Sequence, residues 1–347
     1  MNLINFKKIL KIFSILLTSA ILLVMIIVTA ALIFLSKKIN QPVSYLLNTP
    51  YQTLKNNEFK NQKSINFLIL GLDKRDDRLE KTETTDTIMI AFLNLNNGQI
   101  KITSIPRDLW DYQLNTKINN IYPLSLSNKQ PFDFLQTNFS RLTGIPIEKT
   151  IIFTTQNLID FVEIIGGVDV FLDKVFMDNK YPNPEYITNP KAPIYKTISF
   201  DAGWNHLSES NITEFVRSRK SAETAIGGGT DIGRIERQQS LIDAIIKKIK
   251  TKEFIIDYSN LIKLYNFWHN QINTNLTDKN LTSIGIILQK QIKNISLTKI
   301  ELTIGSNEKE GQIYHPENFI NKQWVFIPAD KEYKNFHQFF QSNFLLY

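Results

Sequence analysis

The chain has 347 residues, 43% of them hydrophobic, so it can bury a sizeable core as one large domain or two small ones. Its 40 basic and 33 acidic side chains give a formal charge of +7, a mild excess that slightly favours anionic partners without identifying them. The absence of cysteine excludes disulfides, thiolate nucleophiles and sulfur-ligated metals, and the four histidines argue against zinc chemistry.

The first predicted element is an apolar helix. The range Ile12–Leu35 contains no charged residue, and its 24 residues, at about 1.5 Å each, would cross a hydrocarbon core of about 30 Å. We therefore predict a transmembrane helix at 12–36, a cytoplasmic tail at 1–11, a polar stalk at 37–63 and an extracytoplasmic domain at 64–347, held at the cell membrane. The alternative is a cleaved signal peptide, whose apolar region normally spans only about 7 to 15 residues.

Three short apolar runs open the predicted domain. The run at 65–71 is stopped by glycine and predicts a buried strand. The runs at 87–93 and 99–105 flank Asn96-Asn97-Gly98, and this combination predicts a hairpin because Asn-Gly accepts positive φ.

Apolar residues at helical spacing predict the helices, and Gly166-Gly167 end one of them before a further strand at 168–172. The predicted helices span 132–142, 157–165, 231–250, 253–269, 277–292 with Thr277 as N-cap, and 331–344. Residues 173–200 contain four prolines and little periodicity, so they are predicted to be a long surface excursion. The alternation of strands and helices predicts the α/β class.

Charged residues stand at the ends of the first two predicted strands. Asp73, with Lys74 and Arg75, comes directly after the first strand, and Asp86 enters the next. Two carboxylates at adjacent strand ends can share one Mg²⁺, which prefers hard oxygen ligands and keeps waters that a phosphate can displace. The alternative, a common role of aspartate, is that both residues cap turns or pair with the neighbouring cations.

A third charged group follows the hairpin. Pro106 stops the β-ladder, so Arg107 is expected at the strand terminus, with Lys117 and Asn119 in the loop-like stretch after it. The alternative is that Arg107 and Asp108 form only a surface ion pair, which contributes about 0 to 1 kcal/mol.

A pair of arginines, Arg217 and Arg219, precedes the long helix predicted at 231–250. Helical positions two apart point in widely different directions, so the two arginines converge only if the helix before them ends and the chain extends. Three glycines at 227–229 then predict a flexible loop.

The long helix itself carries the most informative charged group. Asp231, Arg234 and Gln238 flank its apolar stripe, whereas Arg237 is predicted to point further towards solvent. An arginine held against a core can clamp phosphate through paired N–H donors. The alternative is a structural Arg–Asp brace between helices.

Arginines around a two-carboxylate metal site suit phosphoryl transfer, in which a protein mainly positions groups and neutralises charge on non-bridging oxygens. The sequence has no Walker-type loop, nucleophile elbow or His-Glu-x-x-His motif, and its triple glycine does not follow a predicted strand. A soluble nucleotide is therefore disfavoured as the substrate, and we expect neither nucleotide nor nucleic acid among the partners.

Several short segments stand in a distinctive order. They are Leu68–Arg75, Thr85–Ile90, Ser104–Asp108, Lys117–Asn119, Gly166–Val170, Val216–Arg219 and Asp231–Gln239. Each segment is a weak signal alone, but together and in this order they resemble the LytR-CpsA-Psr family of Gram-positive cell-wall enzymes. The resemblance runs from about Asn66 to the end of the chain.

The resemblance implies a single LytR-CpsA-Psr-type domain, with a central mixed β-sheet flanked by helices, behind one N-terminal transmembrane helix. It implies a transferase that moves an anionic glycopolymer, such as teichoic acid or capsule, from a polyprenyl-pyrophosphate carrier to peptidoglycan. Asp73 and Asp86 would hold Mg²⁺ or Mn²⁺, and these two aspartates would be catalytic together with Arg107. Asp86 is our hypothesis for the general base. Asp231 would orient the arginines. The residues expected to bind the pyrophosphate are Arg75, Arg107, Lys117, Arg217, Arg219, Arg234 and Gln238.

The chain also departs from the family pattern. Thr84 stands where the family often has arginine, so one phosphate contact is missing or is supplied by Lys81. The Gly-Gly pair usual after Lys-x-Asn is absent around 122–127, and the loop at 220–230 is unusual. Two alternatives therefore stay open: a non-catalytic, membrane-anchored scaffold that binds polymer or lipid, and a polyprenyl-pyrophosphate hydrolase that uses water as the acceptor.

Overall fold

The structure is a computed structural model, and it consists of two units. It describes residues 25–55, 58–72, 84–218, 231–251, 253, 257–289, 291, 294–306 and 309–345. The chain divides between Glu58 and Phe59 into a small N-terminal unit and a large second unit that reaches Tyr347. The second unit carries all the described site residues.

In the described part of the N-terminal unit the chain forms the helix Met25–Lys38 and α2 (Val43–Lys55). Among the described residues, no single helix has the length and apolar composition needed to cross a membrane, although Met25–Lys38 and Val43–Thr53, bent by 95°, meet both criteria as a pair. The predicted transmembrane helix begins at Ile12, and residues 12–24 lie outside the described part, as does the predicted tail at 1–11. The spanning helix therefore stays a prediction.

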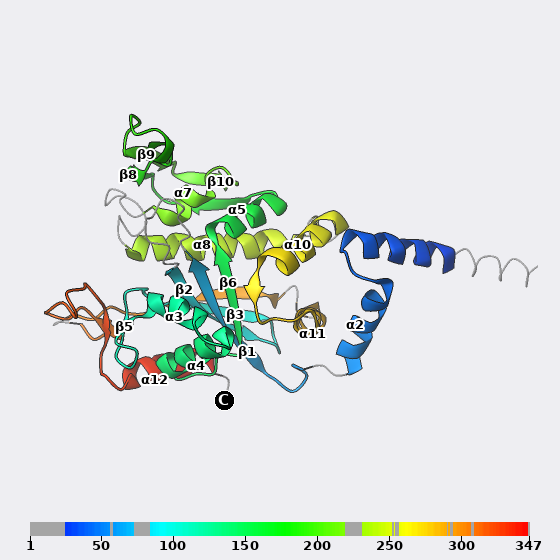
Figure 1. The fold of residues 1–347 in the computed structure, drawn as a ribbon, viewed down its shortest axis with the longest axis horizontal. Helices are drawn as coiled ribbons and strands as arrows, with labels where there is room; N and C mark the ends of the chain where they lie inside the picture. Colours follow the sequence, from blue (N-terminus) through cyan, green and yellow to red (C-terminus); the bar gives the residue numbers. More distant parts are fainter. Residues whose placement is uncertain are drawn as a thin grey trace, which may run out of the picture. The chain divides into compact units, whose positions relative to one another are not determined.

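A mixed six-stranded sheet forms the centre of the second unit, in the order β11-β6-β1-β2-β3-β12 (Figure 1). Its strands are β1 (Ser64–Leu72), β2 (Thr85–Asn94), β3 (Gln99–Ser104), β6 (Lys149–Thr154), β11 (Asn273–Thr274) and β12 (Ser296–Lys299). The pairs β1–β2, β2–β3 and β6–β11 are antiparallel, and the pairs β1–β6 and β3–β12 are parallel. The expected α/β class with a mixed central sheet is thus confirmed.

Both faces of this sheet are buried. Side chains alternate along β1, so that Leu68 and Leu70 join one core while Phe67 and Ile69 join another. The first core is completed by α3 (Ile121–Leu126), α4 (Pro131–Thr143) and α12 (Lys334–Phe344), and the second by α10 (Tyr258–Gln271) and α11 (Asp278–Gln289). A sheet covered on both faces presents functional side chains at its strand ends.

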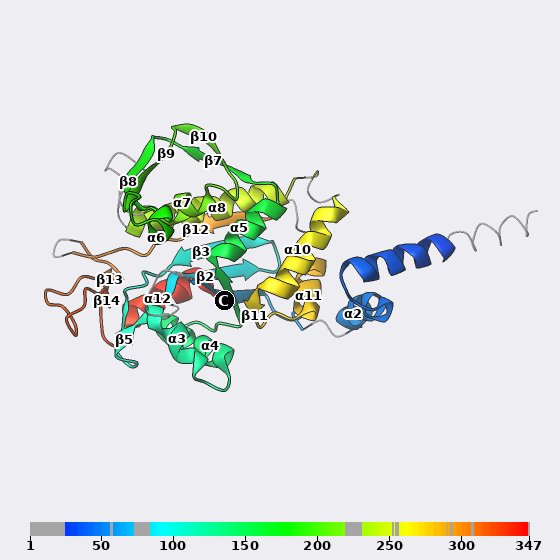
Figure 2. The same cartoon turned by 45° about the horizontal axis from the view of Figure 1, so that its top comes forward.

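A third core lies beside the sheet. It is built from α5 (Thr155–Ile164), β7 (Val168–Leu172), β8 (Phe176–Pro182), β9 (Tyr195–Phe200), β10 (Gly203–Leu207), α7 (Ile212–Arg217) and α8 (Asp231–Ile249). In both views β7 to β10 and α7 gather beside α8, away from α4 (Figures 1 and 2). Helix α8 belongs to two cores, because Leu241 and Ala244 pack into this one and Ile242 packs against the core on the sheet.

The prediction that residues 173–200 form a long surface excursion is wrong. Its residues form the antiparallel pair β8–β9, and Phe176, Tyr181 and Phe200 are buried in the third core. The reason is the placement of the prolines, which stand at the end of β8 and in the connection that contains α6 (Glu185–Thr188). They leave both strands free to pair and to bury every other side chain.

Other local predictions are confirmed. β2 and β3 form the expected hairpin, and Gly98 has φ +76° in its turn. Thr277 caps α11: its Oγ1 accepts a hydrogen bond from Asn280 N at 3.2 Å, and Asn280 Oδ1 accepts one from Thr277 N at 3.0 Å. Helix α10 begins at Tyr258, after an Asp257 cap, and so later than its predicted start.

Short elements join the sheet to the C-terminal part. They are β4 (Trp110–Asp111), β5 (Thr116–Lys117), the 3₁₀ helix η1 (Ile118–Asn120), β13 (Ile313–Tyr314) and β14 (Ile327–Pro328). Phe326 N donates to Asp108 O at 3.0 Å, and Trp110 N donates to Phe326 O at 2.8 Å. These bonds brace the segment that follows Arg107.

Candidate phosphate-binding site

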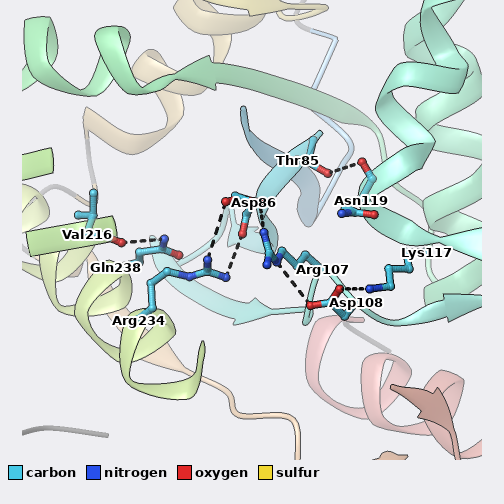
Figure 3. Close-up of polar contacts among 9 residues, drawn as sticks. All are labelled: Thr85, Asp86, Arg107, Asp108, Lys117, Asn119, Val216, Arg234 and Gln238. Carbon is cyan, nitrogen blue, oxygen red and sulfur yellow. Dashed lines mark hydrogen bonds and ion pairs between the residues drawn. The ribbon is translucent and has the colours of Figure 1, made fainter. Parts of the chain in front are cut away.

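Asp86 stands at the centre of the site, near the start of β2 (Figure 3). Arg107 Nη1 donates a hydrogen bond to Asp86 Oδ1. From α8, Arg234 Nη2 donates to the main-chain oxygen of Asp86 at 3.3 Å, and Arg234 Nη1 lies 4.0 Å from Asp86 Oδ2. One carboxylate is therefore held between two guanidinium groups that come from different elements.

The β2–β3 hairpin explains why Asp86 and Arg107 meet. Antiparallel pairing places the start of β2 beside the end of β3, and Ile105 N donates to Ile88 O at 2.9 Å as the ladder ends. Pro106 then begins a turn closed by a 2.9 Å bond from Leu109 N to Pro106 O. Arg107 lies within this turn, at the strand terminus where it was predicted.

Gly71 allows the strands to approach closely at the same edge. It pairs with Thr87 in the β1–β2 register. A Cβ atom at this position would lie 2.9 Å from Thr87 Cβ and 3.1 Å from the ring of Phe153, closer than packed carbon atoms allow. The close packing of the strands therefore requires glycine at position 71, where the first predicted strand was expected to stop.

A second carboxylate extends the group. Lys117 Nζ donates to Asp108 Oδ1 at 2.6 Å, and Arg107 Nε lies 3.4 Å from Asp108 Oδ2 (Figure 3). Lys117, Asp108, Arg107, Asp86 and Arg234 thus form a continuous series of alternating charge, here called the charged chain. Because it holds three cations and two carboxylates, its formal charge is +1.

The loop after Arg107 is tied back to the strands. Asn119 N donates to Arg107 O at 3.2 Å, and Thr85 Oγ1 donates to Asn119 O at 3.3 Å. The interpretation of Arg107 and Asp108 as a simple surface pair missed the link to Lys117. Nine residues of separation carry no periodic signal, so only the turn and the β4–β5 pair reveal the contact.

The members of the charged chain differ in exposure. The side chains of Arg107, Lys117 and Asp86 are 23%, 18% and 17% exposed, whereas that of Arg234 is 4% exposed. Partial burial strengthens ion pairing, because water screens these charges less than it screens charges on an open surface. The outer members can still reach a ligand in solvent.

The end of α7 brings Arg217 to the helix that carries Arg234. Helix α7 ends at Arg217, and Ser218 is extended with φ −58° and ψ 139°, which meets the condition stated for the two arginines. Gln238 Nε2, one turn beyond Arg234 on α8, donates to Val216 O at 3.4 Å. We call Arg217, Ser218, Arg237 and Gln238 the α7–α8 junction.

The prediction that Arg237 points towards solvent is wrong. Its side chain is 2% exposed, its Nε donates to Phe215 O at 2.9 Å, and its Nη2 donates to Ser218 O. Its guanidinium carbon lies 4.4 Å from the centre of the Phe176 ring. The face of α8 that the apolar pattern left for solvent is covered by β8, from the segment expected on the surface.

Burial also changes the acid–base behaviour of Arg237. Removal from water, with a smaller contribution from the positive charge of Arg234, lowers the pKa of Arg237 to about 10. The negative charges of Asp178 and Glu236 act in the opposite direction. Arg237 therefore stays protonated at neutral pH, as a buried cation.

Several predicted site residues lie outside the described part of the chain: Asp73, Arg75, Lys81 and Arg219, together with Lys74 and the loop 220–230. Asp231 is the first residue of α8, and its orienting role stays a prediction. Within the described residues, no group of three or more His, Cys, Asp or Glu side chains could hold a metal ion. Of the two predicted metal ligands, the structure therefore describes Asp86 only.

The arrangement is suited to a diphosphate. Arginine offers a rigid fork of N–H donors that matches phosphate oxygens. The charged chain brings two such forks to Asp86 at the start of β2: Arg107 comes from the turn after β3, and Arg234 comes from α8. The carboxylates that now hold these cations keep them in place for an anionic ligand.

The sequence model of the LytR_cpsA_psr family matches residues 34–338 of this chain. The chain belongs to the LytR_cpsA_psr family. Among its curated relatives, the polyisoprenyl-teichoic acid–peptidoglycan teichoic acid transferase TagU of Bacillus mycoides is 26% identical over 244 residues, 69% of this chain and 68% of the relative. The protein of the same name from Oceanobacillus iheyensis is 24% identical over 282 residues, 80% of this chain and 75% of the relative.

Solved structures of similar fold support the architecture of this family member. Bacillus subtilis TagV superposes with a TM-score of 0.56 at 20% identity, over 81% of this chain and 97% of TagV. A structure of TagT bound to LI-WTA gives a TM-score of 0.52 at 19% identity, over 82% of this chain and 91% of TagT. At these identities the likeness establishes the fold alone.

Proposed function

We propose that this LytR_cpsA_psr protein is a transferase that moves an anionic glycopolymer from a polyprenyl-pyrophosphate carrier to peptidoglycan. Its family membership and the teichoic acid transferase activity for which its TagU relatives are named support the reaction class. The observation that carries the proposal is the position of Asp86 between Arg107 and Arg234, which lie 21 and 148 residues further along the chain. Such convergence of distant arginines suits a diphosphate.

The charged chain would bind the pyrophosphate by exchanging partners. In the structure, Arg107 and Arg234 contact Asp86, and Lys117 contacts Asp108. Phosphate oxygens offer the same guanidinium and ammonium groups a more highly charged acceptor. The cations therefore need little movement to bind the ligand, which is the benefit of groups positioned before the reaction.

The proposed reaction breaks one P–O bond and forms another. A peptidoglycan hydroxyl attacks the phosphorus that carries the glycan, and the bond from that phosphorus to the bridging oxygen breaks. Polyprenyl phosphate leaves, and the glycan becomes attached through a phosphodiester. We assign Asp86 as the base that accepts the hydroxyl proton, and Arg107 and Arg234 as the groups that neutralise charge growing on the phosphate oxygens.

A divalent cation is also proposed. Mg²⁺ is commonly bound through one or two carboxylates together with the oxygens of a phosphate substrate, and the hard carboxylate of Asp86 at this edge fits that requirement. Asp73 and Asp86 would hold Mg²⁺ or Mn²⁺. When bound, the cation would neutralise part of the diphosphate charge.

The substrate suggests where the protein works. We propose a single-pass location in the cell membrane, with a cytoplasmic N-terminus and an extracytoplasmic domain, because a polyprenyl donor stays in the bilayer. The uncharged run Ile12–Leu35 supports an anchor. Protease protection of the N-terminus in closed membrane vesicles, with digestion of the domain from the outer face, would be the expected result; the opposite pattern would contradict it.

The decisive experiment separates transfer from its alternatives. The full chain in detergent is given a polyprenyl-pyrophosphate-linked teichoic acid and Mg²⁺, with and without peptidoglycan, and the products are identified by mass analysis. We expect polymer on peptidoglycan together with polyprenyl phosphate, and neither product with the Asp73→Ala variant. Release of polymer without peptidoglycan would favour a hydrolase, and binding without any product would favour a scaffold.

A further inference from the structure

The last turn of α7 is held by side chains from α8. The final carbonyl groups of a helix have no partner within the helix. Here Phe215 O accepts from Arg237 Nε at 2.9 Å, Val216 O accepts from Gln238 Nε2 at 3.4 Å, and Ser218 O accepts from Arg237 Nη2. Arg217 lies in the chain between the two carbonyls that Arg237 binds.

The surroundings of Arg237 fix its guanidinium group on several sides. The Phe176 ring lies against it at 4.4 Å, and the side chain is 2% exposed. Asp178, 1% exposed, is near enough to act on it electrostatically, and Ser218 Oγ donates to Asp178 Oδ2. A buried cation that donates to two main-chain carbonyls in this way holds those carbonyls together.

Arg237 is one turn from Arg234 on the same helix, and the two arginines contact different segments of the chain. Arg234 reaches the main chain of Asp86 on β2, whereas Arg237 reaches the main chain at the end of α7. Helix α8 is therefore the rigid link between the charged chain and Arg217. A rigid link matters because a misplacement of about 1 Å can slow a reaction by about a hundredfold.

We infer that Arg237 is a positioning residue, which fixes the end of α7 and thereby holds Arg217 in place for the pyrophosphate. This inference rests on the proposed function, because Arg217 has a ligand to bind only if the site takes a diphosphate. Lysine cannot replace Arg237, because a single ammonium on a flexible stem does not reproduce a planar fork that donates to two carbonyls at once.

The test is a double-mutant cycle on the full chain in detergent, read as the Kd for inorganic pyrophosphate with Mg²⁺. Arg237→Lys keeps the positive charge and should weaken binding by about tenfold, since it acts through Arg217. In an Arg217→Ala background, the same change should weaken binding by less than about twofold. Equal effects in both backgrounds would overturn the inference, because they would mean that Arg237 acts independently of Arg217.

Two controls distinguish positioning from general destabilisation. Arg141→Lys changes another partly buried arginine, which pairs with Asp111 and takes no part in the charged chain, and it should leave pyrophosphate binding unchanged. All titrations run well below each unfolding midpoint. If Arg237→Lys does not fold, Ser218→Ala replaces it in the cycle: it removes the hydroxyl that contacts Asp178, and its effect on binding should likewise vanish in the Arg217→Ala background.

The outcomes also separate this inference from the proposed function. Wild-type protein that binds no pyrophosphate would overturn both. Wild-type protein that binds and transfers, with additive effects of Arg237→Lys and Arg217→Ala, would overturn the inference alone. Binding with a coupled cycle but no transfer product would leave the positioning role standing and reject the transferase.

Discussion

The two ends of the candidate site hold their cations in different ways. In the charged chain, Arg107 and Lys117 are partly exposed and pair with carboxylates. In the α7–α8 junction, Arg237 is buried and binds main-chain carbonyls against an aromatic ring. A partly exposed cation that is paired with a carboxylate can exchange it for phosphate, whereas a cation enclosed among carbonyls cannot leave. The first end is therefore suited to binding, and the second to holding the first in place.

The largest expected effect is on stability, at the junction. Arg237→Met should lower the free energy of unfolding by about 3–5 kcal/mol, because it removes one partner of a buried charged network and leaves two carbonyl groups without their donor. Urea denaturation followed by circular dichroism would measure the change. A loss of unfolding free energy below about 1 kcal/mol would show that the junction stabilises the fold no more than an exposed ion pair does.

Arg107→Ala tests the opposite end. It should reduce the transfer rate by about 10²–10³, the usual consequence of removing a positioned donor to developing charge. Its effect on unfolding should stay within about 1 kcal/mol, because the lost ion pairs are partly exposed. The transfer rate and the free energy of unfolding are measured on the same samples, and Arg141→Ala serves as the matched control variant outside the charged chain. Unaltered transfer would count against the assignment of Arg107.

Lys117→Ala should have a smaller effect, of about fivefold to tenfold. Lys117 joins the charged chain at Asp108 and not at Asp86, and an ammonium is a point charge without the paired donors of arginine. We expect the change mainly in KM, since binding of the anionic donor loses one charge while the arginines stay in place. A fall in kcat equal to that of Arg107→Ala would contradict the different roles assigned to Lys117 and Arg107.

The smallest effect concerns Glu236, beside Arg237 on α8. Burial, helped by the negative charge of Glu301, raises the pKa of Glu236 above its usual value of 4.5. The folded protein therefore holds this proton to higher pH than the unfolded chain does, and the contribution to stability is lost as pH rises through the raised pKa. Glu236→Gln should remove that decline from the profile of unfolding free energy against pH, measured by urea denaturation upwards from the usual pKa of glutamate. A profile unchanged from wild type would contradict it.

The sequence by itself determined the local parts of the site. Asn-Gly chemistry predicts the β2–β3 hairpin, and the hairpin alone brings Asp86 to Arg107. The sequence also states that Arg217 and Arg219 can converge only if the helix before them ends, and α7 does end at Arg217. The order of motifs is enough to indicate the family that the matching model shows. These features depend on neighbours in the chain or on short-range geometry.

Only the tertiary structure decided which faces are covered. An apolar stripe predicts one buried face of a helix, but α8 is buried on a second face by β8, and this placed Arg237 inside the protein. The link from Lys117 to Asp108 likewise depends on a turn that no periodicity encodes. The physical reason is that a pattern records the polarity of a surface, whereas a buried cation is tolerated wherever distant main-chain carbonyls happen to meet it.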